Sequence, residues 1–167
     1  MGTENRGYYT ARHPPGEGTE PNVPMETPAG NILLLEDDDG LGAILMAVLQ
    51  DQGYNVVRVS NGKQALKHLW TGPLPDLILL NLVMPVMDGW EFREQLKRIP
   101  EMAQIPVVVL SGVRNLERKA ASLGATDSFT KPYNLKALID TVQQYCPQPE
   151  PAGWNGGDGA NQTRPGS

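Results

Sequence analysis

The fold of this chain is decided at residues 76–89, which read DLILLNLVMPVMDG. Residues 77–80 form a short, continuous apolar run of the kind found in a strand that is covered on both faces. Asn81 closes this run, and a turn with Pro, Asp and Gly follows it. We therefore expect the Asn81 side chain to project from the C-terminal end of a buried strand.

Apolar runs and helical stripes alternate on both sides of this stretch. Strands are predicted at residues 32–35, 54–59, 77–80, 105–110 and 127–130. Apolar residues at helical spacing predict helices over residues 41–52, 61–71, 88–99, 115–123 and 135–142. This regular alternation predicts an α/β fold, a doubly wound, five-stranded parallel sheet with helices on both faces.

The two ends of the chain differ from this alternating centre. Residues 1–30 are dominated by Pro, Gly, Glu and Thr, residues 147–167 are similar, and neither segment has helical or strand periodicity. Such composition is typical of disordered arms. We expect a disordered arm at 1–30, one domain at 31–146 and a disordered tail at 147–167.

Charge and cysteine content narrow the class of function. The net charge of -5 and the absence of any Lys/Arg run argue against a nucleic acid or a membrane surface as the partner. Cys146 is the single cysteine, so no intrachain disulfide is possible. No signal peptide or membrane-spanning stretch is visible, and together these features indicate a cytoplasmic protein.

Polar side chains follow four of the predicted strands. They are Glu36 and Asp37, Asn81, Ser111 and Lys131. The carboxyl ends of parallel strands meet at one edge of a sheet, where ligands bind. An acidic run by itself is more often a solvated loop or helix N-terminus. Two carboxylates with a carboxamide and a backbone carbonyl suit Mg²⁺, and a lysine and a hydroxyl suit phosphoryl oxygens, so the set predicts a phosphoryl site.

Four motifs carry a resemblance to a known family: LLLEDD at 33–38, PDLILLNLVMPVMDG at 75–89, VVVLSG at 107–112 and FTKP at 129–132. In this order and spacing they resemble the receiver domain of bacterial two-component response regulators, over about residues 31–146. The resemblance implies a flavodoxin-like (βα)5 fold and a part in phosphorelay signal transduction. It implies a signalling module and not an enzyme.

The resemblance also implies roles for individual residues. The expected Mg²⁺ ligands are Glu36, Asp37, Asn81 and the Val83 carbonyl. Ser111 is the expected switch hydroxyl, and Lys131, in a cis peptide with the next proline, the expected phosphoryl-contacting lysine. The implied partners are signalling proteins, a histidine kinase or a downstream effector, bound through the last two helices and the strand between them.

Two positions depart from the family pattern. Asn81 stands where the family has its phosphoaccepting aspartate, and a carboxamide neither attacks phosphorus nor lends negative charge to a metal. We therefore expect a pseudo-receiver that is not phosphorylated and binds Mg²⁺ weakly. Ser128 stands at the aromatic switch position, and strand alternation points the adjacent Phe129 to the other face.

A phosphatase of the haloacid-dehalogenase type is the alternative reading. Residues 37–40, DDDG, resemble the Asp-x-Asp-Gly start of that class, with Asp37 as the nucleophile. Leu41 stands where Thr or Val is usual, and no later acidic pair for Mg²⁺ is found. The receiver interpretation is therefore preferred.

Overall fold

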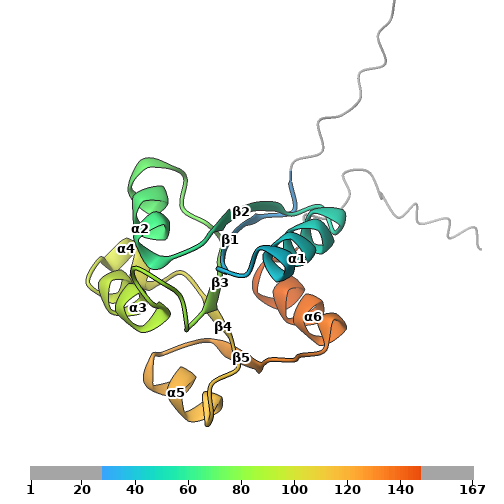
Figure 1. The fold of residues 1–167 in the computed structure, drawn as a ribbon. Coiled ribbons are helices and arrows are strands. Elements are labelled where there is room, and N and C mark those ends of the chain that lie inside the picture. The colour runs from blue at the N-terminus through green and yellow to red at the C-terminus, as the bar shows by residue number, and fades with distance from the viewer. Residues whose placement is uncertain (1–27, 148–167) are drawn as a thin grey trace, which may run out of the picture.

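The computed structural model describes residues 28–147, and Figure 1 shows their arrangement. The strands are β1 (Asn31–Leu35), β2 (Asn55–Val59), β3 (Leu77–Asn81), β4 (Val107–Ser111) and β5 (Asp127–Thr130). They form one parallel sheet in the order β2-β1-β3-β4-β5, which confirms the predicted fold class. Apart from residues 28–30 and 147, the predicted arms lie outside the described residues.

The helices are α1 (Asp39–Asp51), α2 (Gly62–Thr71), α3 (Gly89–Lys97), α4 (Pro100–Ala103), α5 (Leu116–Ser122) and α6 (Leu135–Tyr145). Six helices in residues 28–147 are one more than predicted, because the helix expected over residues 88–99 is followed by the separate short α4. Pro100 explains the break. It has no N–H for a continuing helix, but it fits the first turn of a new one.

Helices cover both faces of the sheet, as Figure 1 shows. The α1 and α6 side is filled by Leu34, Leu45 and Leu138, among others. The side of α2, α3 and α5 is filled by residues such as Leu35 and Phe92. Every residue of β3 and β4 is buried. A strand buried on both faces needs apolar side chains at successive positions, which is why these strands are continuous apolar runs.

The register of the sheet brings the strand ends to one edge. Leu35 pairs with Leu80, Asn81 with Leu110, and Ser111 with Thr130. The residues that follow these ends therefore lie together at the carboxyl edge of the sheet, where ligands of parallel sheets bind. No helix within the described part of the chain is long and apolar enough to cross a membrane.

Candidate functional site

The acidic loop after β1 carries one buried and one exposed carboxylate. Glu36 is 1% exposed, and Asp37 is exposed. Lys131 Nζ lies 2.6 Å from Glu36 Oε2, and the Asp38 backbone N–H donates to Glu36 Oε1 over 3.2 Å. A carboxylate removed from water needs such a partner on each oxygen. Glu36 is therefore held in one orientation, with Oε1 turned away from the lysine.

The Asn81 side chain is the centre of the site. Its Nδ2 donates to Asp37 Oδ1 and to the Val83 carbonyl, both at 2.9 Å, and to Glu36 Oε1 at 3.3 Å. Its Oδ1 accepts the Val83 N–H at 3.3 Å. All three oxygens around Nδ2 are acceptors, so an amide turned the other way would place oxygen against oxygen. The hydrogen-bond network fixes the direction of the amide.

These oxygens belong to three of the four predicted Mg²⁺ ligands, and they converge on Nδ2 of the fourth, Asn81. The oxygen types suit Mg²⁺. However, no group of three or more His, Cys, Asp or Glu side chains within residues 28–147 is arranged to hold a metal. A cation would have to displace the amide nitrogen or turn Asn81 so that Oδ1 faces it. A divalent ion at this position would compete with the hydrogen bonds of the Asn81 amide.

The residues expected to contact a phosphoryl group border this centre. Ser111 is fully buried at the end of β4, and its Oγ has no hydrogen-bond partner among the described residues. The Lys131 N–H donates to the Ser111 carbonyl over 3.0 Å, and the Lys131–Pro132 peptide is cis, as expected.

Burial, and secondarily the charge of Glu36, raises the pKa of Tyr133 to about 12. That phenol stays neutral at physiological pH.

The β5 strand follows the sequence prediction. Phe129 packs on the α1 and α6 side of the sheet, where its ring meets Tyr133 edge to face at 6.3 Å. Ser128 points to the opposite face, because neighbouring strand residues alternate. The position three residues before Lys131 therefore holds no aromatic ring, and the small side chain of Ser128 is half-buried there.

The loop after Asn81 exposes two valines at the rim of the site. Val83 is 60% exposed and Val86 is 77% exposed. Val86 has a φ of 68°, in the left-handed region that a β-branched residue rarely adopts. Such strain is unfavourable by about 1–2 kcal/mol. The exposed Val86 side chain has little buried surface to offset it.

We expect Val86→Gly to stabilise the protein by about 1 kcal/mol, because relief of the left-handed strain exceeds the extra unfolded-state entropy of glycine. Thermal or urea unfolding measures this. Val83→Gly is the matched control. It removes an exposed valine whose φ is not positive, and should destabilise by about 0.5–1 kcal/mol. Equal effects of the two changes would contradict the strain argument.

Sequence reasoning did not single out two arginines that hold parts of this domain together. Arg93 of α3 is 6% exposed and donates to the Leu123 and Gly124 carbonyls at 3.1 and 3.2 Å, which ties α3 to the end of α5. Burial lowers its pKa. Arg58 of β2 contacts the acidic loop. The available signal was a charged residue inside an apolar pattern, directly after Phe92 in one case and after Val57 in the other.

Comparison with known proteins places this geometry in context. The family model described as "Response regulator receiver domain" matches residues 32–143. Sporulation initiation phosphotransferase F of Bacillus subtilis (strain 168) is 33% identical over 116 residues, which cover 70% of this chain and 93% of that protein. The signal receiver domain of a signal transduction histidine kinase from Syntrophus aciditrophicus matches with a TM-score of 0.65 and 28% identity, over 83% of this chain and 97% of that one. The Mn(2+)-bound form of response regulator Rcp1 matches with a TM-score of 0.59 and 31% identity, over 69% and 90%.

Proposed function

This chain belongs to the response regulator receiver family, and we propose that it is a pseudo-receiver that acts in two-component signalling through protein–protein contacts without being phosphorylated. One observation carries the proposal. Asn81, at the position that the resemblance gives to the phosphoacceptor, turns its amide nitrogen into the pocket, toward Glu36, Asp37 and the Val83 carbonyl. An amide nitrogen has no available lone pair, so the pocket presents no nucleophile there.

Receiver domains are signalling modules that interact with histidine kinases and effectors, and are not enzymes in general. We propose the same non-enzymatic role here. The phosphatase alternative is not favoured, because the matches are to receiver and response-regulator proteins. Its nucleophile would be Asp37, whose Oδ1 is already hydrogen-bonded to the Asn81 amide.

The proposed partner surface consists of α5, β5 and α6. Both helices present charges to solvent, including Glu117 and Arg118 on α5 and the 2.8 Å ion pair of Lys136 with Asp140 on α6. The buried Arg93 anchors the end of α5. A mixed-charge surface suits another protein better than nucleic acid or an anionic membrane, in keeping with the net charge of -5. We also propose a cytoplasmic location, because the single cysteine, Cys146, suits a reducing compartment.

The chain as it stands tests this proposal. Incubated with acetyl phosphate and Mg²⁺, it should gain no phosphoryl mass by intact mass spectrometry. Binding of its histidine kinase or effector, measured by calorimetry, should have the same Kd with and without acetyl phosphate. A phosphoryl group on any pocket residue, or a Kd that changes with the phosphodonor, would overturn the proposal.

We propose that Mg²⁺ binds weakly. Response regulator Rcp1 is described in an Mn(2+)-bound form, and the pocket of this chain contains hard oxygen donors of the kind that Mg²⁺ prefers. Glu36, Asp37, the Val83 carbonyl and, once turned, Asn81 Oδ1 would hold the ion. When bound, it would neutralise charge on phosphoryl oxygens. The neutral amide contributes less attraction than a carboxylate, so binding should be millimolar or weaker.

We also propose that residues 31–146 are the folding unit. At its C-terminal end Val142 and Cys146 are buried, and the Tyr54 hydroxyl donates to the Cys146 carbonyl over 2.9 Å. A shortened chain of residues 30–146 should melt within a few degrees of the full chain. A chain that ends at residue 141 loses these contacts and should melt far lower. A collapse of the transition in the 30–146 chain would show that the arms contribute to folding.

A further inference from the structure

At the start of the acidic loop between β1 and α1, the backbone carbonyl of Glu36 has no hydrogen-bond partner on a neighbouring strand. The Glu36 N–H still donates to the Val59 carbonyl over 3.0 Å, as the last bond of the β1–β2 ladder. The Glu36 carbonyl then accepts a side-chain bond instead, from Arg58 Nε at 3.1 Å. A backbone carbonyl at a buried strand end needs such a partner. Arg58 therefore extends the ladder by one residue, at the residue that carries the buried carboxylate.

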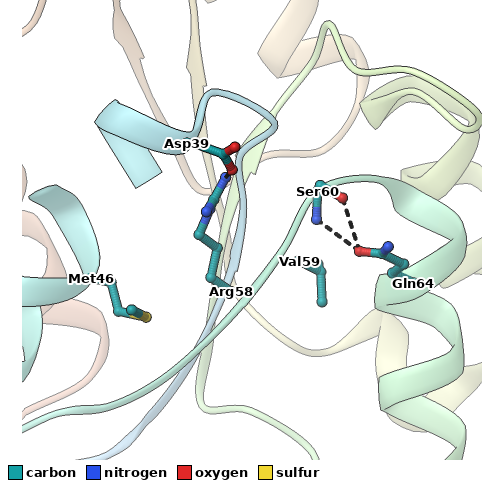
Figure 2. A pocket seen from close by; sticks show the side chains of 6 residues that line it. All are labelled: Asp39, Met46, Arg58, Val59, Ser60 and Gln64. Carbon is teal, nitrogen blue, oxygen red and sulfur yellow. Dashed lines mark hydrogen bonds and ion pairs between the residues drawn. The ribbon is translucent and has the colours of Figure 1, made fainter. Parts of the chain in front are cut away.

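Arg58 also holds the far end of the same loop. Figure 2 shows its side chain rising from β2 toward Asp39 at the start of α1, and Arg58 Nη2 lies 2.8 Å from Asp39 Oδ1. The Arg58 side chain is 20% exposed, whereas that of Asp39 is 95% exposed. Of the two contacts, the one to the Glu36 carbonyl is the sheltered one. The exposed ion pair contributes little by itself.

Gly42 in α1 makes room for this arginine. A Cβ at residue 42 would lie 2.2 Å from Arg58 Nε and 2.7 Å from Arg58 Cζ. Gly42 lies inside a helix and has no positive φ, so its backbone does not require glycine. Glycine inside a helix is unfavourable relative to alanine. The close approach of the guanidinium is the reason that the structure offers for glycine here.

We infer that Arg58 is a positioning residue of the pocket. Through its bond to the Glu36 carbonyl, Arg58 sets the loop so that the oxygens of Glu36 and Asp37 meet at Asn81 Nδ2. Gly42, which has no side chain, leaves the space that the Arg58 guanidinium occupies. The inference rests on the proposed function only in taking this pocket as the receiver's site, because the geometry itself holds for the chain as it stands.

The side-chain NH₂ of Asn81, observed by ¹⁵N NMR in the full chain, is the probe of loop position. Arg58→Met should shift its resonances and speed its hydrogen exchange by about tenfold, since losing alignment with even one acceptor is worth about 1.4 kcal/mol of protection. Gly42→Ala should do the same. Arg58 borders a cavity of about 380 Å³ with Met46 and Gln64, so the displaced guanidinium has room to move without unfolding the domain.

Two comparisons separate positioning from general stability. Asp39→Asn removes only the exposed ion pair and should leave the Asn81 resonances nearly unchanged. The double variant Gly42→Ala with Arg58→Met should give the same Asn81 resonances and exchange rate as Arg58→Met, because Gly42→Ala acts only by displacing Arg58. The double variant should nevertheless melt at a higher temperature than Arg58→Met, because alanine favours the helix.

Unchanged Asn81 resonances in Arg58→Met, with melting confirming a folded domain, would overturn the inference. The inference would also be overturned if Gly42→Ala had no effect at Asn81. It would likewise be overturned if the increases in the Asn81 exchange rate from the two single changes multiplied in the double variant. Each of these readouts is independent of phosphorylation and partner binding. Failure of the positioning role is therefore distinguishable from failure of the proposed function.

Discussion

Asn81→Asp gains one phosphoryl group when incubated with acetyl phosphate and Mg²⁺, and the conversion goes from none in the unchanged chain to the majority of the protein. A carboxylate oxygen at this point attacks phosphorus, the phosphorus–oxygen bond to acetate breaks, and acetate leaves. The remaining pocket residues are in place, since Lys131 Nζ lies 2.6 Å from Glu36 and the Ser111 hydroxyl has no protein partner in the described structure. Only the nucleophile is replaced.

Intact mass spectrometry over time decides this prediction. Asn81→Ala is the control, because it empties the position without adding a nucleophile and should stay unmodified. We also expect the phosphoryl group to be long-lived, because Val83, two residues after Asn81, and Val113, two residues after Ser111, offer no side-chain group to orient a hydrolytic water. An Asp variant that gains no mass would show that the pocket is impaired beyond residue 81.

The sequence was sufficient for the fold because its evidence is local and repeated. Continuous apolar runs such as residues 77–80 specify strands buried on both faces, and a helical stripe follows each strand. Parallel strands joined in this way bring their carboxyl ends to one edge. The convergence of Glu36, Asn81 and Lys131 could therefore be predicted, although they are up to 95 residues apart.

The sequence could not show which hydrogen bonds and side-chain contacts the site residues make. The direction of the Asn81 amide depends on three acceptors that only the folded chain brings together. The pairing of Arg58 with Gly42 is likewise a contact between β2 and α1 that leaves no periodic trace. The split between α3 and α4 was missed for a different reason. Pro100 both ends one helical pattern and begins the next, so the two read as a single helix with a disturbed end.

Asn81→Asp should also be less stable than the unchanged chain by about 2–4 kcal/mol when no divalent ion is present. The amide now donates to Glu36, Asp37 and the Val83 carbonyl, and the variant replaces these bonds with a third carboxylate. Two like charges about 4 Å apart repel by about 4 kcal/mol at an effective dielectric of 20. Lys131 and the solvent around the exposed Asp37 reduce the net effect. The melting temperature should fall by roughly 10 °C.

Mg²⁺ should reverse most of this loss in the variant and change the unchanged chain little. An ion present at about 100 times its Kd stabilises the folded state by about 2.7 kcal/mol, whereas binding at a Kd of several millimolar gives less than about 1 kcal/mol at 10 mM Mg²⁺. Thermal melts with EDTA and with 10 mM Mg²⁺ measure both responses. Asn81→Ala separates the causes, since it loses the amide hydrogen bonds without adding charge. If the Asp and Ala variants have the same melting temperature in EDTA, charge repulsion is not the cause of the lost stability. Mg²⁺ could also raise the melting temperature of the unchanged chain as much as that of the Asp variant. In that case the Asn81 amide does not compete with the ion, and its position at the centre of the pocket does not weaken metal binding.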